Sequence, residues 1–115
     1  MRKVLNAKIK RTMLGVEEHY CFTFDLELEL QDGGGVNFGG YALDEWDASK
    51  QERVVVSGQA IKEVLKVTGV NKWEDLKDTY IRAIMDNNMI IGIGNILKDK
   101  WFIPKEFWGN KQCGN

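Results

Sequence analysis

The chain has little of what catalytic and metal-binding sites are usually built from. Its 115 residues include one histidine, two cysteines and one proline. That histidine, His19, follows Glu17 and Glu18, and a lone histidine beside two acids is more typical of a loop than of a metal site, which gathers several ligands. No GxSxG elbow and no GxGxxG or GK[ST] phosphate loop is present. The sequence therefore predicts a protein that is not an enzyme and holds no metal and no cofactor.

An excess of charge of one sign is also missing. Sixteen basic and seventeen acidic residues leave a formal net charge of -1, so the overall field does not attract nucleic acid. Nucleic acid remains a possible partner through a local patch but is not favoured. No apolar run reaches the length of a membrane helix and no leader opens the chain, so no membrane contact is expected. Cys21 and Cys113 lack metal-ligand spacing and are expected to be reduced thiols.

The length is that of one domain, and 43% hydrophobic residues suffice for a modest core. We expect a single α+β domain over residues 1–108 and a frayed tail over residues 109–115. Alternating apolar and polar residues predict a mostly antiparallel sheet of about five or six strands, open or barrel-like. The predicted strands are 4–13, 20–30, 38–43, 80–84 and 89–93. Residues 95–101 are either a last strand or irregular.

The first two predicted strands are expected to pair as a hairpin. The first places one row of side chains on a shared face: Leu5, Ala7, Ile9 and Arg11. The second alternates between an apolar face and a face with three carboxylates, Asp25, Glu27 and Glu29. Strand alternation explains this carboxylate row without a bound cation. The row would repel itself unless basic residues of the first strand lie beside it, which favours the hairpin.

Two helices complete the predicted domain. The main helix runs from Ser57 or Gly58 to Thr68, with Gly69 just past its end. A single-turn helix is predicted over residues 71–76, capped by Asn71. Residues 86–88 favour a hairpin turn, and residues 44–52 lack periodicity and read as an exposed loop. The expected core contacts of the short helix are Trp73 and Leu76.

Residues 32–44 form the most unusual stretch, because five glycines there surround Phe38 and Tyr41. Glycine adopts positive φ and lets another backbone or a ligand come close. One interpretation is a wide turn or bulge in a bent sheet. The other is a ligand laid against bare backbone with one aromatic ring stacked on it. We expect one of the two aromatics in the core and Tyr41 partly exposed beside Arg82.

Arg82 lies within a predicted strand, where an unpaired guanidinium would be costly. Its partner is either an internal carboxylate, such as Asp44 or Asp75, or an anionic ligand. Trp46, in a charged segment, and Trp108, which follows Phe107 near the end, have no evident core role and are candidate interface anchors. The candidate ligand- or partner-binding residues are Gly34, Gly35, Phe38, Gly39, Gly40, Tyr41, Asp44, Trp46 and Arg82.

Four blocks of the sequence resemble a family of small proteins found in phages and prophages. The blocks are MLGVEEH at 13–19, FGGYALD at 38–44, WEDL at 73–76 with YIR at 80–82, and IGNILKDKWF at 93–102. The resemblance spans most of residues 7–103 and leaves out the segment beyond Pro104. It implies a phage origin and hence a place in the host cytoplasm. Small phage proteins of this size often act against host defence, as anti-CRISPR proteins or by sequestering a nucleotide immune signal.

We therefore expect a non-enzymatic phage binding protein that counteracts bacterial defence. Its partner would be a nucleotide signal or a host defence protein such as a CRISPR nuclease, and self-association remains open. The nucleotide is slightly favoured, because glycine backbone, aromatics and Arg82 suit a phosphate-bearing ligand. The alternative is a nucleic-acid-binding OB-like β domain with a groove formed by Lys8, Lys10 and Arg11. A metal-dependent hydrolase using His19 and nearby acids is a third possibility.

Overall fold

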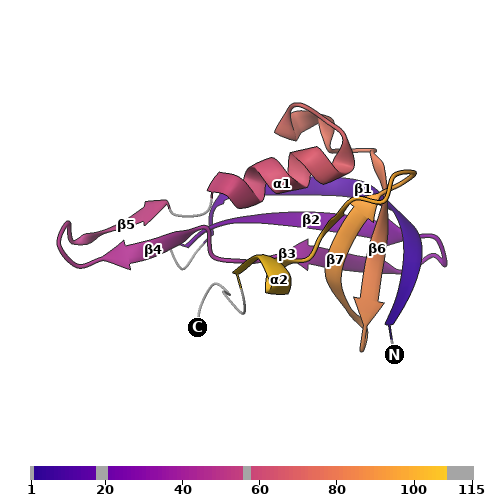
Figure 1. The fold of residues 1–115 in the computed structure, drawn as a ribbon, viewed down its shortest axis with the longest axis horizontal. Coiled ribbons are helices and arrows are strands. Elements are labelled where there is room, and N and C mark those ends of the chain that lie inside the picture. Colours follow the sequence, from indigo (N-terminus) through magenta and orange to yellow (C-terminus); the bar gives the residue numbers. More distant parts are fainter. Residues whose placement is uncertain (1, 18–20, 56–57, 109–115) are drawn as a thin grey trace.

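The computed structural model describes residues 2–17, 21–55 and 58–108, without the side chains of residues 53–55 and 107–108. Six strands form one antiparallel sheet in the order β3-β2-β1-β6-β7-β8 (Figure 1). Their bounds are β1 (Arg2–Val16), β2 (Phe22–Leu30), β3 (Gly35–Gly39), β6 (Tyr80–Asp86), β7 (Met89–Asn95) and β8 (Trp101–Phe102). The α+β prediction is confirmed. The barrel-like version is wrong, because the sheet has two free edges and does not close.

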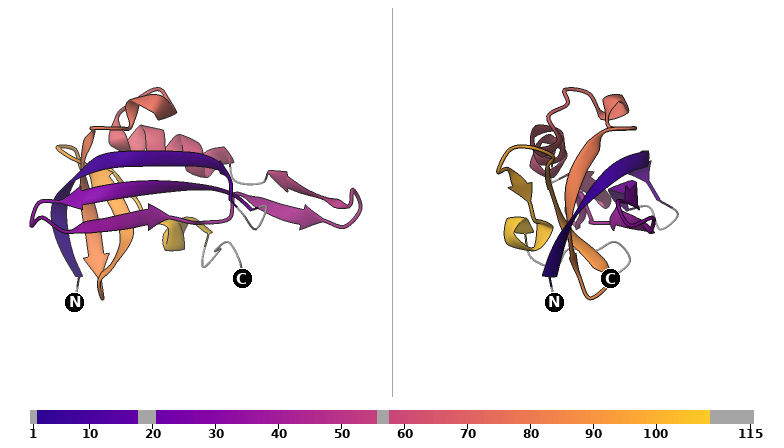
Figure 2. Two further views of the ribbon diagram at one scale, coloured as in Figure 1. Left: turned by 180° about the vertical axis from the view of Figure 1, so that it is seen from behind. Right: turned by 90° about the vertical axis from the view of Figure 1, so that its right-hand side faces the viewer.

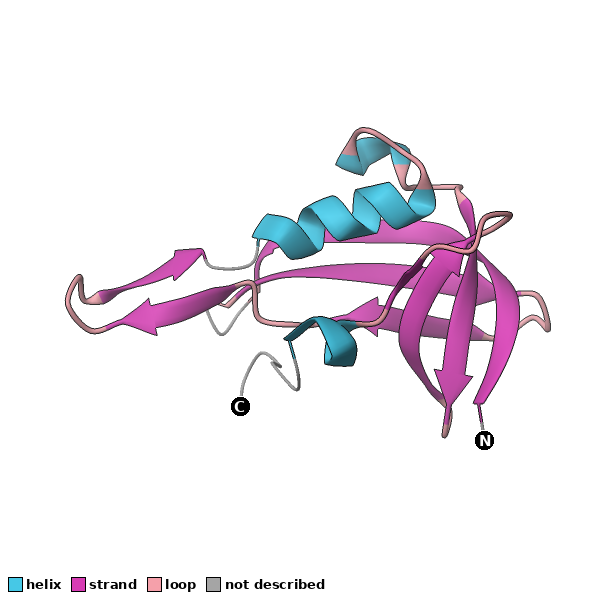
Figure 3. Cartoon of the chain, in the orientation of Figure 1, coloured by secondary structure: helices cyan, strands magenta, loops and turns pink. Residues whose placement is uncertain are grey.

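Among the described residues the remaining elements are one ribbon and three helical segments (Figure 3). Strands β4 (Asp44–Asp47) and β5 (Glu52–Val55) pair with each other in a separate two-stranded ribbon. The main helix is α1 (Gly58–Thr68), and η1 (Trp73–Asp75) and α2 (Pro104–Trp108) are short. No helix among the described residues is long and apolar enough to cross a membrane.

Strand β1 belongs to both halves of the curled sheet. Its residues 7–16 pair with β2 and its residues 2–8 pair with β6. Figure 1 shows β6 and β7 crossing β2 and β3 steeply. Between Ile9 and Arg11 the register with β2 shifts, so Lys10 is the extra residue of a β-bulge, which bends and twists a strand. Beyond the bulge Arg11 lies on the outer face, which corrects its predicted place beside Ile9.

The predicted hairpin of the first two strands is confirmed, and two of its three carboxylates have basic neighbours on the first strand. The Arg11 guanidinium lies 3.3 Å from the Glu27 carboxylate, and the Lys10 ammonium lies 3.9 Å from Glu29. On the other face the apolar row of β2 is buried. The alternation of apolar and polar residues was sufficient to predict the buried face of β2, because one side of the strand is covered and the other is not.

The core fills the concave side of the sheet. Its largest fully buried side chains include Phe24 on β2, Phe38 on β3, Ile9 on β1 and Ile93 on β7. Helix α1 packs against β7 and β8 and buries Ala60, Val64, Val67 and Thr68. The helix ends at Gly69 as predicted: φ there is +82°, and the Gly69 and Val70 N–H groups both donate to Leu65 O.

The turn between β6 and β7 is also as predicted. Asn87 and Asn88 both have positive φ, 53° and 64°, as the two-residue turn of a tight hairpin requires.

Three boundary predictions are wrong, each for a local reason. The third strand ends at Gly39 rather than residue 43, because Gly39 and Gly40 take positive φ. Residues 44–52 are not a loop, since β4 and the start of β5 lie there. The short helix spans only Trp73–Asp75, and the side chain before it, Lys72, makes no capping hydrogen bond. Helix α2 was not predicted at all; it begins at Pro104, a residue whose fixed φ suits the first helical position.

We expect Gly39→Ala to lower the free energy of unfolding by about 2 kcal/mol or more, because strained backbone and a clash act together. A Cβ at Gly39 would lie 2.4 Å from Phe24 O, whereas a Cβ at Gly40 would meet nothing within 4 Å. Gly40→Ala is the control and should cost about 1 kcal/mol, from its φ alone. Urea denaturation followed by tryptophan fluorescence measures both. Equal losses in the two variants would show that the close approach at Gly39 is not a constraint.

Candidate functional site

The glycine-rich stretch first serves the fold. Gly34 lies in the β2–β3 turn, where its N–H donates to Asp32 Oδ1 at 3.0 Å, and Gly35 begins β3. Gly39 has no room for a side chain, because the Phe24 carbonyl of the neighbouring strand occupies that space. Two glycines of the stretch leave open space beside them: Gly33 in the turn, with φ of +94°, and Gly40, with φ of +79°. The stretch is therefore a turn followed by a strand end rather than a cradle of bare backbone.

The two aromatics of this stretch have different surroundings. Phe38 is 1% exposed and its ring lies 5.9 Å from that of Phe24 and 6.3 Å from that of Phe102. Tyr41 is half-buried and packs on Phe24 and Phe38, and this burial raises the pKa of its hydroxyl. The predicted division into a core ring and a partly exposed ring is confirmed. Tyr41 lies in this aromatic cluster, however, and not beside Arg82.

Arg82 finds its partners in the loop between β7 and β8. Its Nε donates to Asn95 O and its Nη2 to Lys98 O, both at 2.7 Å, and its guanidinium lies 4.4 Å from the centre of the Trp101 ring. The Trp101 ring in turn covers Gly94, where a Cβ would overlap it. The expected internal partner is thus present, but it consists of two carbonyls and an indole.

Neither Asp44 nor Asp75 pairs with Arg82 among the described residues. The sequence prediction of a carboxylate partner is therefore wrong. Carbonyl groups at the end of β7 and in the β7–β8 connection accept the hydrogen bonds of the guanidinium instead.

Asp44 and Trp46 lie on the β4–β5 ribbon, which projects from the body of the protein (Figures 1 and 2). We call residues 44–55 the arm. Its root is anchored: Leu43 is fully buried and its N–H donates to Phe22 O at 2.8 Å, while Asp44 Oδ1 accepts from the Phe22 N–H at 3.2 Å. Along its length the two strands of the arm contact chiefly each other. The side chain of Trp46 is 57% exposed.

The tip of the arm is held by a single carboxylate. Asp47 Oδ1 accepts hydrogen bonds from Ser49 Oγ at 2.6 Å, from Ser49 N–H at 2.9 Å and from Lys50 N–H at 3.3 Å. The Ser49 side chain is the main cause of a pKa of Asp47 below its ordinary value. An arm fixed at its root and at its tip presents its side chains in a defined arrangement.

The register of the arm places three carboxylates on the face opposite its tryptophan. Asp47 pairs with Glu52 across the ribbon, and Glu45 lies two residues from Asp47 on the same face. These three carboxylates therefore share one face. Trp46 alternates with them and lies on the other face, in register with Arg53.

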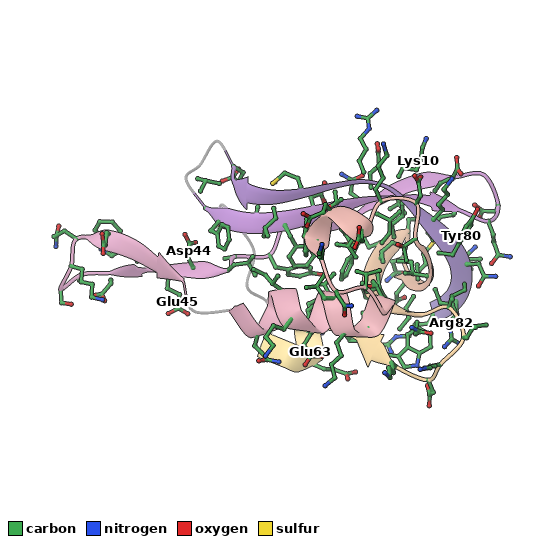
Figure 4. All side chains as sticks on the ribbon, turned by 90° about the horizontal axis from the view of Figure 1, so that it is seen from above. Lys10, Asp44, Glu45, Glu63, Tyr80 and Arg82 are labelled. Carbon is green, nitrogen blue, oxygen red and sulfur yellow. The ribbon has the colours of Figure 1, made fainter. Side chains whose placement is uncertain are left out.

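The nine predicted site residues therefore do not gather at one site. Figure 4 shows Asp44 at the root of the arm and Arg82 at the opposite end of the molecule. Phe38 is buried in the core, Gly39 packs against the neighbouring strand, and Arg82 donates to the carbonyl of Asn95. Of the predicted set, Trp46 is the one with a large exposed apolar side chain.

One exposed surface was missed at the level of the sequence. Tyr80 is 58% exposed on the outer face of β6, next to Lys8 of β1, whose Nζ lies 5.9 Å from the centre of its ring. Ile81 and Ala83 are fully buried, so alternation alone places Tyr80 and Arg82 outward. The sequence contains this alternation, but the prediction of a strand there assigned no outward position to Tyr80.

The carboxylate row of β2 makes contacts within its own sheet. Asp25 accepts a hydrogen bond from the Asn37 side chain at 2.9 Å, while Glu27 and Glu29 have basic neighbours on β1. Burial is the main cause that raises the pKa of Asp25, and the Glu27 charge adds to it. Within the described ranges no group of three or more histidine, cysteine or acidic side chains is placed to hold a metal. His19 lies outside those ranges.

Cys21 is disulfide-bonded. The expectation of a reduced thiol is therefore wrong for this residue. Spacing carried no signal, because the chain has only two cysteines and they lie near opposite ends of the sequence. Cys113 and the predicted frayed tail lie outside the described residues.

Comparison with protein families, curated proteins and solved structures finds no match to this chain. Two surfaces remain as candidates on geometry: the arm with Trp46, and the outer face of the sheet around Tyr80.

We expect Arg82→Lys to lower the free energy of unfolding by about 1–3 kcal/mol, because an ammonium cannot replace the forked hydrogen bonds to two carbonyls and the stacking on Trp101. Arg11→Lys is the matched control, since Arg11 makes an exposed ion pair worth less than about 1 kcal/mol. Urea denaturation measures both variants. A loss at Arg82 no larger than the loss at Arg11 would contradict the structural role of Arg82.

Proposed function

We propose that this protein is a non-enzymatic phage protein that counteracts bacterial defence by docking its arm onto a host defence protein, such as a CRISPR nuclease. The resemblance of its sequence blocks to phage and prophage proteins supports the phage origin. The observation that carries the protein-binding role is the exposed indole of Trp46 on a projecting ribbon.

The arm has the properties of a binding element rather than of a part of the core. A two-stranded ribbon without a covering layer is only marginally stable in water. An exposed tryptophan is costly in solution, and tryptophan is among the residues that contribute most binding energy at interfaces. The anchored root at Leu43 and the capped tip at Asp47 reduce the ordering that binding requires.

The charge of the arm favours a basic partner surface. Glu45, Asp47 and Glu52 share one face of the ribbon, and none of the three is buried. A nuclease binds the phosphate backbone through clustered lysine and arginine side chains. A basic cleft that takes in both faces of the ribbon would contact these carboxylates on one face and Trp46 on the other, and the arm would compete there with nucleic acid. Inhibition by this route needs no catalysis.

Two alternative functional hypotheses, a nucleotide pocket and an OB-like domain, have less support. The nucleotide pocket expected in the glycine-rich stretch lacks its main elements, because Gly39 packs against its own sheet and Arg82 is engaged by its own loop. An OB-like nucleic-acid domain would need a five-stranded barrel and unpaired basic residues. The sheet is open, and Lys10 and Arg11 face Glu29 and Glu27.

We expect Trp46→Ala to abolish the anti-defence effect without unfolding the protein. The assay is phage plating on bacteria that carry one of a panel of defence nucleases, with and without this protein. For the nuclease that wild-type protein inhibits, Trp46→Ala should weaken binding by about 2 kcal/mol or more, as loss of an interface anchor does. Reversing the acidic face with Glu45→Lys and Glu52→Lys should slow association.

Leu97→Ala is the matched control, because Leu97 is an apolar side chain, 88% exposed, that lies outside the arm. It should plate and bind like wild type. Full activity of Trp46→Ala would exclude docking through the arm. Sedimentation of the free protein tests a second copy as the occupant: a dimer that Trp46→Ala dissociates would assign the arm to self-association.

A further inference from the structure

The outer face of the sheet carries an open groove that the arm does not touch. It spans strands β2, β1 and β6 and has a volume of about 370 Å³. This size is within the range of small-molecule sites in proteins. The groove is lined by Asn6, Ala7, Lys8, Glu29, Gln31 and Tyr80, with Leu30 and Gly33 at its end.

Three side chains of different chemistry form a row across the groove. Lys8 of β1 is in register with Glu29 of β2 on one side and with Tyr80 of β6 on the other. The Lys8 ammonium lies 5.9 Å from the centre of the Tyr80 ring and 3.6 Å from the carboxylate of Asp78. An acceptor, a cation and an exposed aromatic ring thus lie side by side.

The β2–β3 turn adds oriented amide groups. The Asn6 N–H donates to Gln31 Oε1, and the Gln31 N–H donates to Asn6 O at 2.9 Å. These bonds fix the Gln31 side-chain amide while leaving its NH₂ group as a donor. Among the described residues, neither that NH₂ group nor the side chain of Asn6 makes a hydrogen bond. The groove therefore presents donors and acceptors in fixed directions.

We propose that this groove binds a free nucleoside 5′-phosphate whose base carries an exocyclic amino group. The base stacks on the Tyr80 ring, as bases do on exposed aromatics in open sites. The amino group donates to the Glu29 carboxylate, as a base amino group does to Glu or Asp, and uracil has no exocyclic amino group to donate. The phosphate lies near the Lys8 ammonium. This site is independent of the proposed docking of the arm.

The charge around the groove favours a single nucleotide over a nucleic-acid strand. A strand is held by several unpaired lysines and arginines along its backbone. Around this groove Lys8 faces Asp78 and Lys10 faces Glu29, so the groove lacks the run of unpaired basic side chains that a strand needs. Figure 4 shows Lys10 and Tyr80 at the end of the molecule away from Asp44.

The test is a titration of ¹⁵N-labelled full-length protein with AMP, GMP, UMP and orthophosphate, followed by amide chemical shifts. AMP and GMP should shift the amides of Asn6, Lys8 and Tyr80 in a saturable manner, and UMP and orthophosphate should bind at least about fivefold more weakly. Tyr80→Ala should weaken AMP or GMP binding by about tenfold, the effect of losing one stacking ring, whereas Tyr80→Phe should retain it. Melting temperatures verify that both variants fold.

Trp46→Ala is the control and should bind AMP and GMP like wild type, because Trp46 lies on the arm. No saturable shift with AMP or GMP would overturn the proposal, as would equal affinities of Tyr80→Ala and wild type. A dodecameric oligonucleotide that binds much more tightly than AMP at moderate salt would also overturn it and assign the groove to a strand. Loss of anti-defence activity in Trp46→Ala with nucleotide binding intact separates this site from the arm.

Discussion

The close approach of Gly39 to the Phe24 carbonyl determines where the sheet ends and where the arm begins. Only glycine fits there, and the chain leaves the β conformation at once. The next residues are held to the start of β2 by three hydrogen bonds: Gly40 N–H to Phe24 O, Thr23 Oγ1 to Tyr41 O, and Leu43 N–H to Phe22 O. The chain is thus directed along β2 and out of the body, which gives the arm its fixed root.

This arrangement separates two surfaces with different chemistry. The curled sheet encloses one core and leaves its outer face around Tyr80 open, while the arm extends from the other end of the molecule (Figures 1 and 4). The β7–β8 loop is held closed by a hydrogen bond from Arg82 and by the Trp101 ring, which lies against Gly94. Because neither surface supports the core, exposed side chains such as Trp46 and Tyr80 can be substituted with little loss of stability.

The sequence predicted the elements that have one covered face, and it failed where nothing covers the chain. β2 and α1 bury one row of side chains each, so their periodicity was readable. The arm has no buried row beyond its root, so its sequence lacks the periodicity that predicts a strand. The bulge at Lys10 and the fork of Arg82 depend on pairings between distant segments, which no local pattern encodes. The prediction of the candidate site was wrong for the same reason, since Gly39 and Arg82 contact residues that are distant in the sequence.

Amide hydrogen exchange of the free protein tests most directly whether the arm is separable from the body. Exchange through local opening reports stability that differs from that of the whole fold. Amides of β1 and β2 near Ile9 and Phe24 should exchange only through global unfolding, whereas those of Glu45 and Trp46 should exchange much faster through local opening of the ribbon. Equal protection of the arm and the body would contradict an arm that is anchored at its root and uncovered along its length.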